Sequence, residues 1–433
     1  MNERPAALPL LDEVVRDLMG SPLIVGCDVR QIEVTDRPPI EPGAACRAAL
    51  QAPRGTPPLR EFAADRRTAV IITSDATRAV PSAALLPPLL HELAAAGIPA
   101  ERVTVVIGTG AHRAPTDDEL RGILGDLYGQ LRVQSHDARA SDLVEVGRSR
   151  RGTPVLIDRT VAQADLRIAL GEVEQHEFAG FTGGRKAILP AVAGQATILA
   201  NHALDMLAHP GVGPGALDGN VIHEEMLEAA RLARLDFIVN VVVDRELKVV
   251  ALAAGDFEQA HADLVSLIRR YATVSLERRP DVIVTGPDRP LDINLYQATK
   301  ALSSIVPLVG QRSAILLLSA CHEGIGANEL AAPFVGAQSP EEVIDNLRHR
   351  YVVEHNGAFM LADFLRRCPS VVACCPGVSN TALRTLLLEP VADPQAGMAR
   401  ALGVADSQPR DGRPLLVAFI PRSQRLLLSL DAG

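Results

Sequence analysis

The chain has no tryptophan and few other aromatic residues: aromatics make up 3% of its 433 residues, and only four are tyrosines. Proteins that bind single-stranded nucleic acid stack bases on aromatic side chains, so this composition disfavours that class. An excess of basic charge is also absent, since the formal net charge is −9. This charge argues against a nucleic-acid partner or an anionic membrane surface. It leaves room for a small anionic ligand, because local charge governs a pocket.

The six cysteines contain no CxxC pair, the spacing typical of many zinc and redox sites. Reduced, mostly buried thiols are therefore the favoured interpretation. The N-terminus lacks a basic start followed by a long apolar core, and no apolar run is long enough to span a bilayer. These absences predict a soluble, cytoplasmic protein with no membrane partner.

The sequence does contain a regular alternation of strand-length apolar runs, each followed by a polar cluster and then a helical pattern. The runs lie at 68–73, 102–108, 131–137, 153–158 and 165–171, and again at 281–287, 313–320 and 370–377. Strands alternating with helices indicate parallel sheets covered by helices. The predicted fold class is α/β, with two α/β domains, the larger N-terminal one built on a mostly parallel sheet.

The length of the chain also favours more than one domain, because 433 residues exceed one ordinary core. We place an N-terminal domain at 1–274 and a smaller C-terminal domain at 275–395, with the active site expected in the cleft between them. The tail at 396–433 contains two apolar pieces that could pack back on the N-terminal domain, although the sequence does not decide between the two domains.

Polar clusters follow three of the predicted strands: Asp75 with Arg78, then His112, then His176. In open parallel sheets ligands bind beyond the carboxyl ends of the strands, so these clusters predict a common site. In the second domain a helical pattern follows the strand at 281–287. It carries Tyr296, Gln297 and Lys300, and the last two are three residues apart and share a helix face.

The stretch from His176 to His202 reads HEFAGFTGGRKAILPAVAGQATILANH and places Thr182, Gly183, Gly184 and Arg185 directly before Lys186. It is not a Walker loop, because Ala187 follows the lysine. The glycines could still let the backbone approach a phosphate. In one helix Lys186 and His202 would face roughly 160° apart, but Pro190 and Gly194 break the pattern, so the chain can fold back and bring them together.

Each of these features also has a structural interpretation when taken alone. A single histidine in a loop is usually hydrogen-bonded, Asp75 and Arg78 could form an ordinary ion pair, and Arg185–Lys186 could be a solvated basic pair. His136, Asp137 and Asp142 suggest a different site, that of a metal phosphohydrolase, on the weaker basis of one His-Asp dipeptide.

Together the motifs resemble those of the lactate racemase family. They are SDATRAVPS (74–82), GTGAHR (108–113), HEFAGFTGGRKAILP (176–190), Asn201–His202 and YQATK (296–300). The resemblance includes motif order and spacing and covers roughly residues 20–390. Thr182 stands where the family commonly has serine, and Ala191 where glycine often follows the proline. Ala76 and Ala79 also depart from the first motif. The departures preserve the chemical groups and bear on substrate choice.

The resemblance implies a nickel-pincer nucleotide (the nickel complex of pyridinium-3-thioamide-5-thiocarboxylic acid mononucleotide) attached covalently at Lys186. It implies His202 as the nickel ligand and His112 and His176 as the acid/base residues. Its substrate-binding residues would be Arg78, Tyr296, Gln297 and Lys300. Its other cofactor-binding residues would be Asp75, Thr182, Gly183, Gly184 and Arg185.

The function that follows from the resemblance is inversion of the C2 hydroxyl carbon of a 2-hydroxyacid through a 2-keto acid, by proton-coupled hydride transfer. A lactate-like short-chain acid is favoured, and malate, an aromatic lactate or a sugar acid such as gluconate are alternatives. Cofactor-assembly enzymes are expected as transient partners, and the oligomeric state stays open. Two rivals come from other classes: a non-catalytic nickel or nucleotide carrier, which would not need His112 and His176, and the metal hydrolase.

Overall fold

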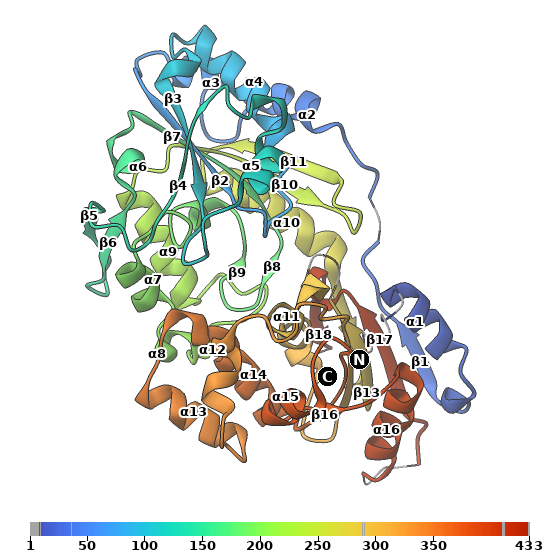
Figure 1. The fold of residues 1–433 in the computed structure, drawn as a ribbon. Coiled ribbons are helices and arrows are strands. Elements are labelled where there is room, and N and C mark those ends of the chain that lie inside the picture. The colour runs from blue at the N-terminus through green and yellow to red at the C-terminus, as the bar shows by residue number, and fades with distance from the viewer. Residues whose placement is uncertain are drawn as a thin grey trace. The chain divides into compact units, whose positions relative to one another are not determined.

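The computed structural model describes residues 8, 10–35, 37–287, 289, 291–408 and 412–431. The chain divides into two compact units. Residues 36–270 form one, here called the middle unit, and residues 1–35 together with 271–433 form the other, here called the terminal unit. Each unit is built around a six-stranded sheet (Figure 1). The α/β fold class predicted from the sequence is confirmed.

The sheet of the middle unit has the strand order β11-β10-β7-β2-β3-β4. Its strands are β2 (Ala69–Ser74), β3 (Val103–Gly108), β4 (Arg132–Ser135), β7 (Leu166–Glu172), β10 (Phe237–Val243) and β11 (Val249–Gly255). All neighbours pair in parallel except β10 and β11. The sheet is therefore mostly parallel, as predicted, and β10 and β11 are strands that our sequence analysis missed.

Apolar side chains explain why these segments form a covered sheet. The β2, β7 and β10 segments are buried along almost their whole length, as expected for parallel strands with both faces covered. Leucines of α4 (Ser82–Ala95) and Leu50 of α2 (Pro42–Gln51) pack against one face of the sheet. Figure 1 shows where these two helices lie. Because this core holds the strands rigidly, the loops at their carboxyl ends have fixed starting points.

The other elements of the middle unit are short helices and two small hairpins. They are α3 (Leu59–Phe62), η2 (Ala100–Arg102), α5 (Asp117–Leu124), η3 (Gly125–Leu127), β5 (Val144–Arg148), β6 (Pro154–Ile157), α6 (Arg159–Gln163), β8 (Gln175–His176), β9 (Gly180–Phe181), η4 (Gly184–Ala187), α7 (Gln195–Asn201), α8 (Leu204–Leu207), α9 (Val221–Leu232) and α10 (Gln259–Ala272). The elements labelled η are short 3₁₀ helices.

The sheet of the terminal unit has the order β1-β17-β13-β14-β15-β16, and every pair in it is parallel. Its strands are β1 (Asp28–Gln31), β13 (Val282–Gly286), β14 (Ala314–Leu318), β15 (Ser370–Cys374), β16 (Glu389–Pro390) and β17 (Leu416–Pro421). α1 (Leu11–Met19) and α16 (Pro394–Asp406) pack together against one face. The remaining strands, β12 (Thr273–Leu276) and β18 (Leu427–Leu430), form a separate parallel pair.

Two boundaries differ from those drawn on the sequence. The first 35 residues belong to the terminal unit, because β1 adds an edge strand beside β17. The tail also belongs there: β17 lies between β1 and β13, where its six residues are all buried. A fully apolar run suits an interior parallel strand. The tail therefore completes the second sheet instead of packing back on the first domain.

The other elements of the terminal unit are helical. They are η1 (Pro22–Ile24), η5 (Leu291–Ile293), α11 (Leu295–Ile305), η6 (Val306–Leu308), α12 (Asn328–Ala331), η7 (Ala332–Phe334), α13 (Pro340–His349), η8 (Val353–His355), α14 (Asn356–Arg367), α15 (Asn380–Thr385) and η9 (Ser423–Arg425). Within the described part of the chain, no helix combines the length and the apolar character needed to cross a bilayer.

Candidate active site

The loops after β2, β3 and β7 lie side by side, because these strands are adjacent in the sheet, with β2 between β7 and β3. Asp75 directly follows β2, His112 lies in the loop after β3, and Glu174 follows β7. The strand-end clusters predicted from the sequence are thus gathered at one edge of the middle unit's sheet, where parallel sheets bind ligands.

His112 is held by Asp75. Its Nδ1 lies 2.8 Å from Asp75 Oδ2, and Asp75 Oδ1 accepts hydrogen bonds from the amide and hydroxyl of Thr77. Burial raises the pKa of Asp75, but the hydrogen bond and charge of His112 and the bonds from Thr77 outweigh it, so the carboxyl pKa lies below its usual value. An ionised Asp75 can only accept a hydrogen bond, so Nδ1 of His112 carries the ring proton and donates it. The lone pair of the neutral ring is then on Nε2.

The His112 side chain is 57% exposed and Asp75 is largely buried. The aspartate therefore orients an imidazole that points its basic nitrogen outward. The carboxylate of Asp75 binds His112 and Thr77, and the contact with the cofactor that was expected from the sequence stays a prediction.

Arg78 is anchored to the loop after β7. Its guanidinium Nη1 lies 3.7 Å from Glu174 Oε1, and the neighbouring amide of Ala79 donates to Glu172 Oε2 at 3.1 Å. Both carboxylates lie at or just beyond the end of β7, so they fix the loop that carries Asp75 and Arg78. A substrate carboxylate at Arg78 would share this guanidinium with Glu174.

The Thr182–Gly184 turn returns the chain across the end of β7. Gly183 and Gly184 have φ values of +76° and +52°, in the left-handed region that favours glycine. A Cβ at Gly183 would come within 2.8 Å of Asn240 Oδ1, and one at Gly184 within 3.1 Å of the His261 ring. The amide of Gly184 donates to that same Asn240 oxygen at 2.8 Å. The turn is therefore locked onto β10 and α10.

The hydroxyl of Thr182 is committed to this turn, because it donates to the carbonyl of Glu172 at 2.7 Å and accepts from the amide of Glu174 at 2.9 Å. A serine could make the same bonds, so the departure from the family motif preserves them. That Thr182, Gly183 and Gly184 contact the cofactor stays a prediction.

Arg185 is buried beneath the turn, with 1% of its surface exposed. It donates to the carbonyls of Ala179 at 2.7 Å and Gly183 at 3.4 Å. Burial lowers its pKa to about 9, so the guanidinium stays charged at neutral pH. The interpretation of Arg185 as half of a solvated basic pair is wrong. Its side chain braces the loop from below, and a contact with the cofactor stays a prediction.

Phe178 joins three of the predicted functional residues. Its ring centroid lies 4.5 Å from that of His176 and 5.0 Å from that of His202, edge to face in both cases. Lys186 Nζ lies 5.7 Å from the same ring and 3.2 Å from His176 Nε2. The structure therefore brings His176, Lys186 and His202 together around one buried phenyl ring.

The break predicted between Lys186 and His202 is confirmed. η4 ends at Ala187, α7 begins at Gln195, and His202 is the C-terminal cap of α7. Burial, followed by the positive charge of Lys186, lowers the pKa of His202 to about 3. Its imidazole is therefore neutral at physiological pH and keeps a lone pair for a metal.

These residues fit the implied cofactor in one specific way. Among the residues that the structure describes, no group of three or more His, Cys, Asp or Glu side chains could hold a metal ion by itself. A lone neutral histidine beside an amine suits a metal that arrives with its other donors already in place. Lys186 and His202 are the residues that would hold such a group.

Tyr296, Gln297 and Lys300 lie on α11 of the terminal unit. Asn294 caps this helix by accepting from the amide of Gln297 at 3.0 Å, and the Tyr296 hydroxyl donates to Asn356 Oδ1 at 2.9 Å. Among the described residues, nothing donates to the buried Oε1 of Gln297. An unpaired buried acceptor is costly, so Gln297 is suited to receive a ligand's donor.

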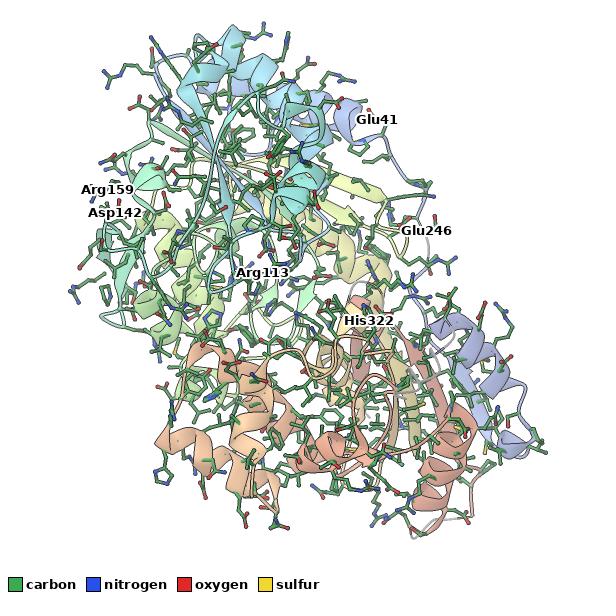
Figure 2. The ribbon with its side chains drawn as sticks, in the orientation of Figure 1. Glu41, Arg113, Asp142, Arg159, Glu246 and His322 are labelled. Atoms are coloured by element: carbon green, nitrogen blue, oxygen red, sulfur yellow. The ribbon has the colours of Figure 1, made fainter. Side chains whose placement is uncertain are left out.

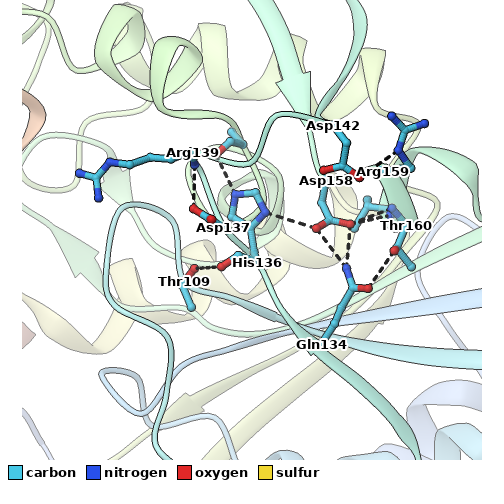
Figure 3. Close-up of polar contacts among 11 residues, drawn as sticks. Thr109, Gln134, His136, Asp137, Arg139, Asp142, Asp158, Arg159 and Thr160 are labelled. Atoms are coloured by element: carbon cyan, nitrogen blue, oxygen red, sulfur yellow. Dashed lines mark hydrogen bonds and ion pairs between the residues drawn. The ribbon is translucent and has the colours of Figure 1, made fainter.

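The residues of the hydrolase rival have structural roles. His136 is fully buried, with Nε2 donating to the carbonyl of Ala193 at 2.9 Å and Nδ1 lying 3.4 Å from Asp158 Oδ2 (Figure 3). Asp137 accepts from the amide of Arg139, and Asp142 pairs with Arg159. Asp142 and Arg159 also lie away from Arg113, the neighbour of His112 (Figure 2). His136, Asp137 and Asp142 form no metal cluster.

Four residues that shape this site were not predicted from the sequence: Glu172, Glu174, Phe178 and Asn240. Glu172 and Glu174 both follow the end of a predicted strand. Residues two apart in an extended chain lie on the same side, which could have marked the two glutamates as a pair. Phe178 lies inside the matched motif but carries no titratable group. Asn240 is a polar residue in the otherwise apolar run FIVNVVV, which is a signal that a polar contact is needed there.

Comparisons with known proteins show which family this chain is similar to. Residues 28–215 match the family model of the lactate racemase N-terminal domain, and residues 277–364 match that of the lactate racemase C-terminal domain. The lactate racemase of Thermoanaerobacterium thermosaccharolyticum is 36% identical over 306 residues, covering 70% of this chain and 72% of the relative. That of Lactiplantibacillus plantarum is 35% identical over 298 residues, covering 68% and 70%.

Two solved structures are also similar. The lactate racemase apoprotein of T. thermosaccharolyticum aligns with a TM-score of 0.82 at 29% identity, over 93% of this chain and 94% of that one. A Thermotoga maritima protein aligns with a TM-score of 0.66 at 15% identity, over 91% and 100%, and this second likeness concerns the fold alone.

The fold and the matches together define an enzyme of the isomerase class, a racemase. The identities and coverage with two curated relatives place it more narrowly. The chain belongs to the lactate racemase family.

Proposed function

We propose that this enzyme inverts the C2 carbon of a 2-hydroxyacid, using a nickel-pincer nucleotide attached to Lys186. The observation that carries the proposal is the cluster around Phe178, which gathers an amine, a neutral imidazole and a second histidine. When bound, the cofactor would supply a hydride acceptor at the reacting carbon, with Lys186 and His202 as its points of attachment.

Side chains of this protein would take up and return the proton of the substrate hydroxyl. Inversion needs a base on each side of the substrate carbon, because the hydroxyl of each enantiomer points differently. His112 meets the requirement through its outward Nε2, because Asp75 accepts from Nδ1 and so fixes the orientation of the ring. His176 is the second base in the proposal. Its position beside Lys186 places it near the group that the lysine would carry.

Substrate binding is assigned to Arg78 in the middle unit and to Tyr296, Gln297 and Lys300 on α11. The cationic side chains suit a carboxylate, and the Gln297 oxygen suits a hydroxyl donor. That all four act at one site rests on the family resemblance. So does transient contact with cofactor-assembly enzymes, and a cytoplasmic location stays a prediction.

A short-chain acid like lactate is the favoured substrate, since both curated relatives are named for it. Malate, an aromatic lactate and a sugar acid such as gluconate are the alternatives. Each of these acids is supplied as a single enantiomer and followed by chiral chromatography. The substrate is the acid that is converted to a racemic or epimeric mixture.

The cofactor proposal is tested by intact mass. Protein produced together with cofactor-assembly enzymes should carry a covalent adduct and bound nickel, and Lys186→Ala should carry neither the adduct nor racemase activity. Wild-type protein that stays at its unmodified mass under these conditions, yet racemises a 2-hydroxyacid, would overturn the assignment of Lys186.

A further inference from the structure

We propose that Glu174 determines substrate specificity: its carboxylate, set against Arg78, restricts the enzyme to 2-hydroxyacids that carry a single negative charge. This inference rests on the proposed function and deepens it, because it names the substrate class of that same site. It excludes malate from the alternatives and retains lactate, aromatic lactates and sugar acids.

The backbone of Glu174 is fixed on both sides by Thr182. The amide of Glu174 donates to the Thr182 hydroxyl at 2.9 Å, and its carbonyl accepts from the Thr182 amide at 2.9 Å. The same hydroxyl is bonded at 2.7 Å to the carbonyl of Glu172, the last residue of β7. The side chain of Glu174 therefore starts from a fixed point beyond the end of the sheet, and a substitution of that side chain leaves these bonds in place.

The ion pair between Glu174 and Arg78 is loose. The distance of 3.7 Å from Oε1 to Nη1 exceeds the roughly 2.7–2.9 Å of a charge-assisted hydrogen bond. Both side chains are mostly shielded from solvent, with 23% and 22% of their surfaces exposed. Within the described part of the chain, no hydrogen bond reaches the carboxylate or the guanidinium. Arg78 therefore keeps its N–H donors for a ligand, while Glu174 stays close enough to repel a negative charge.

A carboxylate bound by Arg78 lies in the field of Glu174. A ligand with one carboxylate is compensated for this repulsion by two parallel N–H bonds from the guanidinium. In malate a short carbon chain joins the two carboxylates, so the second one also stays within roughly 10 Å of Glu174, about one Debye length. Salt screens charges incompletely over such a distance, above all beside a half-buried pair. The second carboxylate is therefore repelled without a compensating bond.

Two further carboxyl groups lie at the same edge of the sheet. Asp75 directly follows β2; burial raises its pKa, but its hydrogen bonds outweigh this effect and hold the pKa below the usual value. Glu172 ends β7, and its Oε2 accepts from the amide of Ala79 at 3.1 Å. Arg78 therefore shares this edge with three carboxyl groups, which favours a ligand with one negative charge over a ligand with two.

The other cations of this edge have partners of their own. Arg113 donates to both carboxylate oxygens of Glu119, at 2.7 and 2.8 Å. Arg185 is buried and donates to main-chain carbonyls below the turn. Lys186 would give up its charge on attachment of the cofactor, because an acylated lysine nitrogen is neutral. Among the described residues of this edge, Arg78 is then the cation that can receive a ligand's carboxylate.

Three substrates separate the charge of the ligand from its size. Lactate is small and has one carboxylate, and malate is larger and has two. The malate amide, in which an amide replaces the second carboxylate, has the size of malate and the charge of lactate. Enzyme loaded with cofactor receives each acid as a single enantiomer at about pH 7.5, where both carboxyl groups of malate are ionised. By chiral chromatography, the wild-type kcat/KM should be at least about tenfold higher for the malate amide than for malate.

Glu174→Gln removes the negative charge and keeps the shape of the side chain. The ratio of kcat/KM for malate to that for the malate amide should rise about tenfold, because the dianion is relieved of more repulsion than the monoanion. The change should lie in KM, with kcat for lactate within about threefold of wild type, because the lost repulsion acts on binding. Glu174→Asp keeps the charge and should leave the ratio within about twofold of wild type.

Glu258→Gln is the matched control. Glu258 forms an exposed pair with Arg231 at 2.7 Å, so the substitution removes the same charge from another glutamate–arginine pair. Arg231 lies in the last turn of α9, which leads into the start of β10, so this pair lies at the opposite edge of the sheet from the strand ends of the site. The ratio in Glu258→Gln should equal that of wild type.

An unchanged ratio in Glu174→Gln, with the KM of every acid raised equally, would overturn the proposal, because Glu174 would then only hold Arg78 in place. Wild-type enzyme that converts malate as efficiently as the malate amide would overturn it too, since another cation would then receive the second carboxylate. Both results leave the proposed function intact. Loaded enzyme that converts no 2-hydroxyacid at all refutes the proposed function and the substrate class with it.

Discussion

The middle unit contains two histidine–aspartate pairs at neighbouring strand ends, and they differ in burial. His112, after β3, is 57% exposed, and Asp75 holds only its Nδ1. His136, after β4, is fully buried, with one ring nitrogen facing Asp158 and the other bonded to the carbonyl of Ala193. The same two residue types thus build an oriented base in one place and a structural brace in the other. The two pairs differ in whether the second ring nitrogen of the histidine is left open.

The largest effect that this comparison predicts is on catalysis. His112→Ala should lower kcat by about 10³-fold, within the range for loss of a general base, in protein loaded with cofactor. Unfolding stability should fall less than on loss of a buried histidine, because the exposed side chain loses only its bond to Asp75. Racemisation followed by chiral chromatography, with urea unfolding alongside, measures both. Retention of more than a tenth of the wild-type kcat would mean that His112 is not a base for either enantiomer.

The opposite pattern is expected for the buried pair. His136→Ala should destabilise the protein by roughly 2–4 kcal/mol, because it removes the bond between His136 and Asp158 and leaves the Ala193 carbonyl without its imidazole donor. Activity per folded molecule should stay close to wild type. Urea unfolding and active-site titration of the folded fraction test this. A variant that is stable but inactive would indicate a catalytic role for His136 and contradict this comparison of the two pairs.

The smallest effect is on acid stability. Burial raises the pKa of Asp158, but bonds from His136 and from the amides of Val161 and Thr160 outweigh it, so the folded pKa lies below the ordinary 3.8. A lowered carboxyl pKa contributes stability that is present above pH 3.8 and is lost as the pH falls through the folded value. Asp158→Asn should therefore lower stability at pH 7 and flatten its decline below pH 4.

Unfolding measured from pH 7 to pH 3 tests this sign. His112→Ala is the matched control for the other pair, since it removes the bond that lowers the pKa of Asp75 and should also flatten the acid decline. A steeper decline in Asp158→Asn would mean that the carboxyl is destabilising when ionised.

The strand-end residues could be predicted from the sequence because both signals are local. Continuous apolar runs indicate buried strands, and the polar residues that follow them are confined to one edge of a parallel sheet. Asp75, Arg78, His112 and His176 were found in this way. The break at Pro190–Gly194 was found because proline and glycine interrupt a helix wherever they stand.

What could not be predicted depends on contacts between distant segments. The apolar run at 22–29 predicts a strand, but β1 lies at 28–31, where DVRQ shows no apolar pattern and the strand forms by pairing with β17. That Asp75 faces His112, and that Phe178 lies between His176 and His202, depends on loop conformations that no spacing rule specifies. The proton on Nδ1 of His112 depends on the same loop conformations, because they place Asp75 opposite that nitrogen.

The position of β17 also bears on the order in which the chain folds during synthesis. All six strands of the middle unit's sheet are contained in residues 69–255, so that unit has its complete core once α10 has left the ribosome. The terminal unit must wait, because β17 separates β1 from β13 and follows the whole middle unit along the chain. The residues of α1 and β1 therefore stay without their sheet until β17 has been made, and exposed Val14, Val15 and Leu18 of α1 are where a chaperone would be needed.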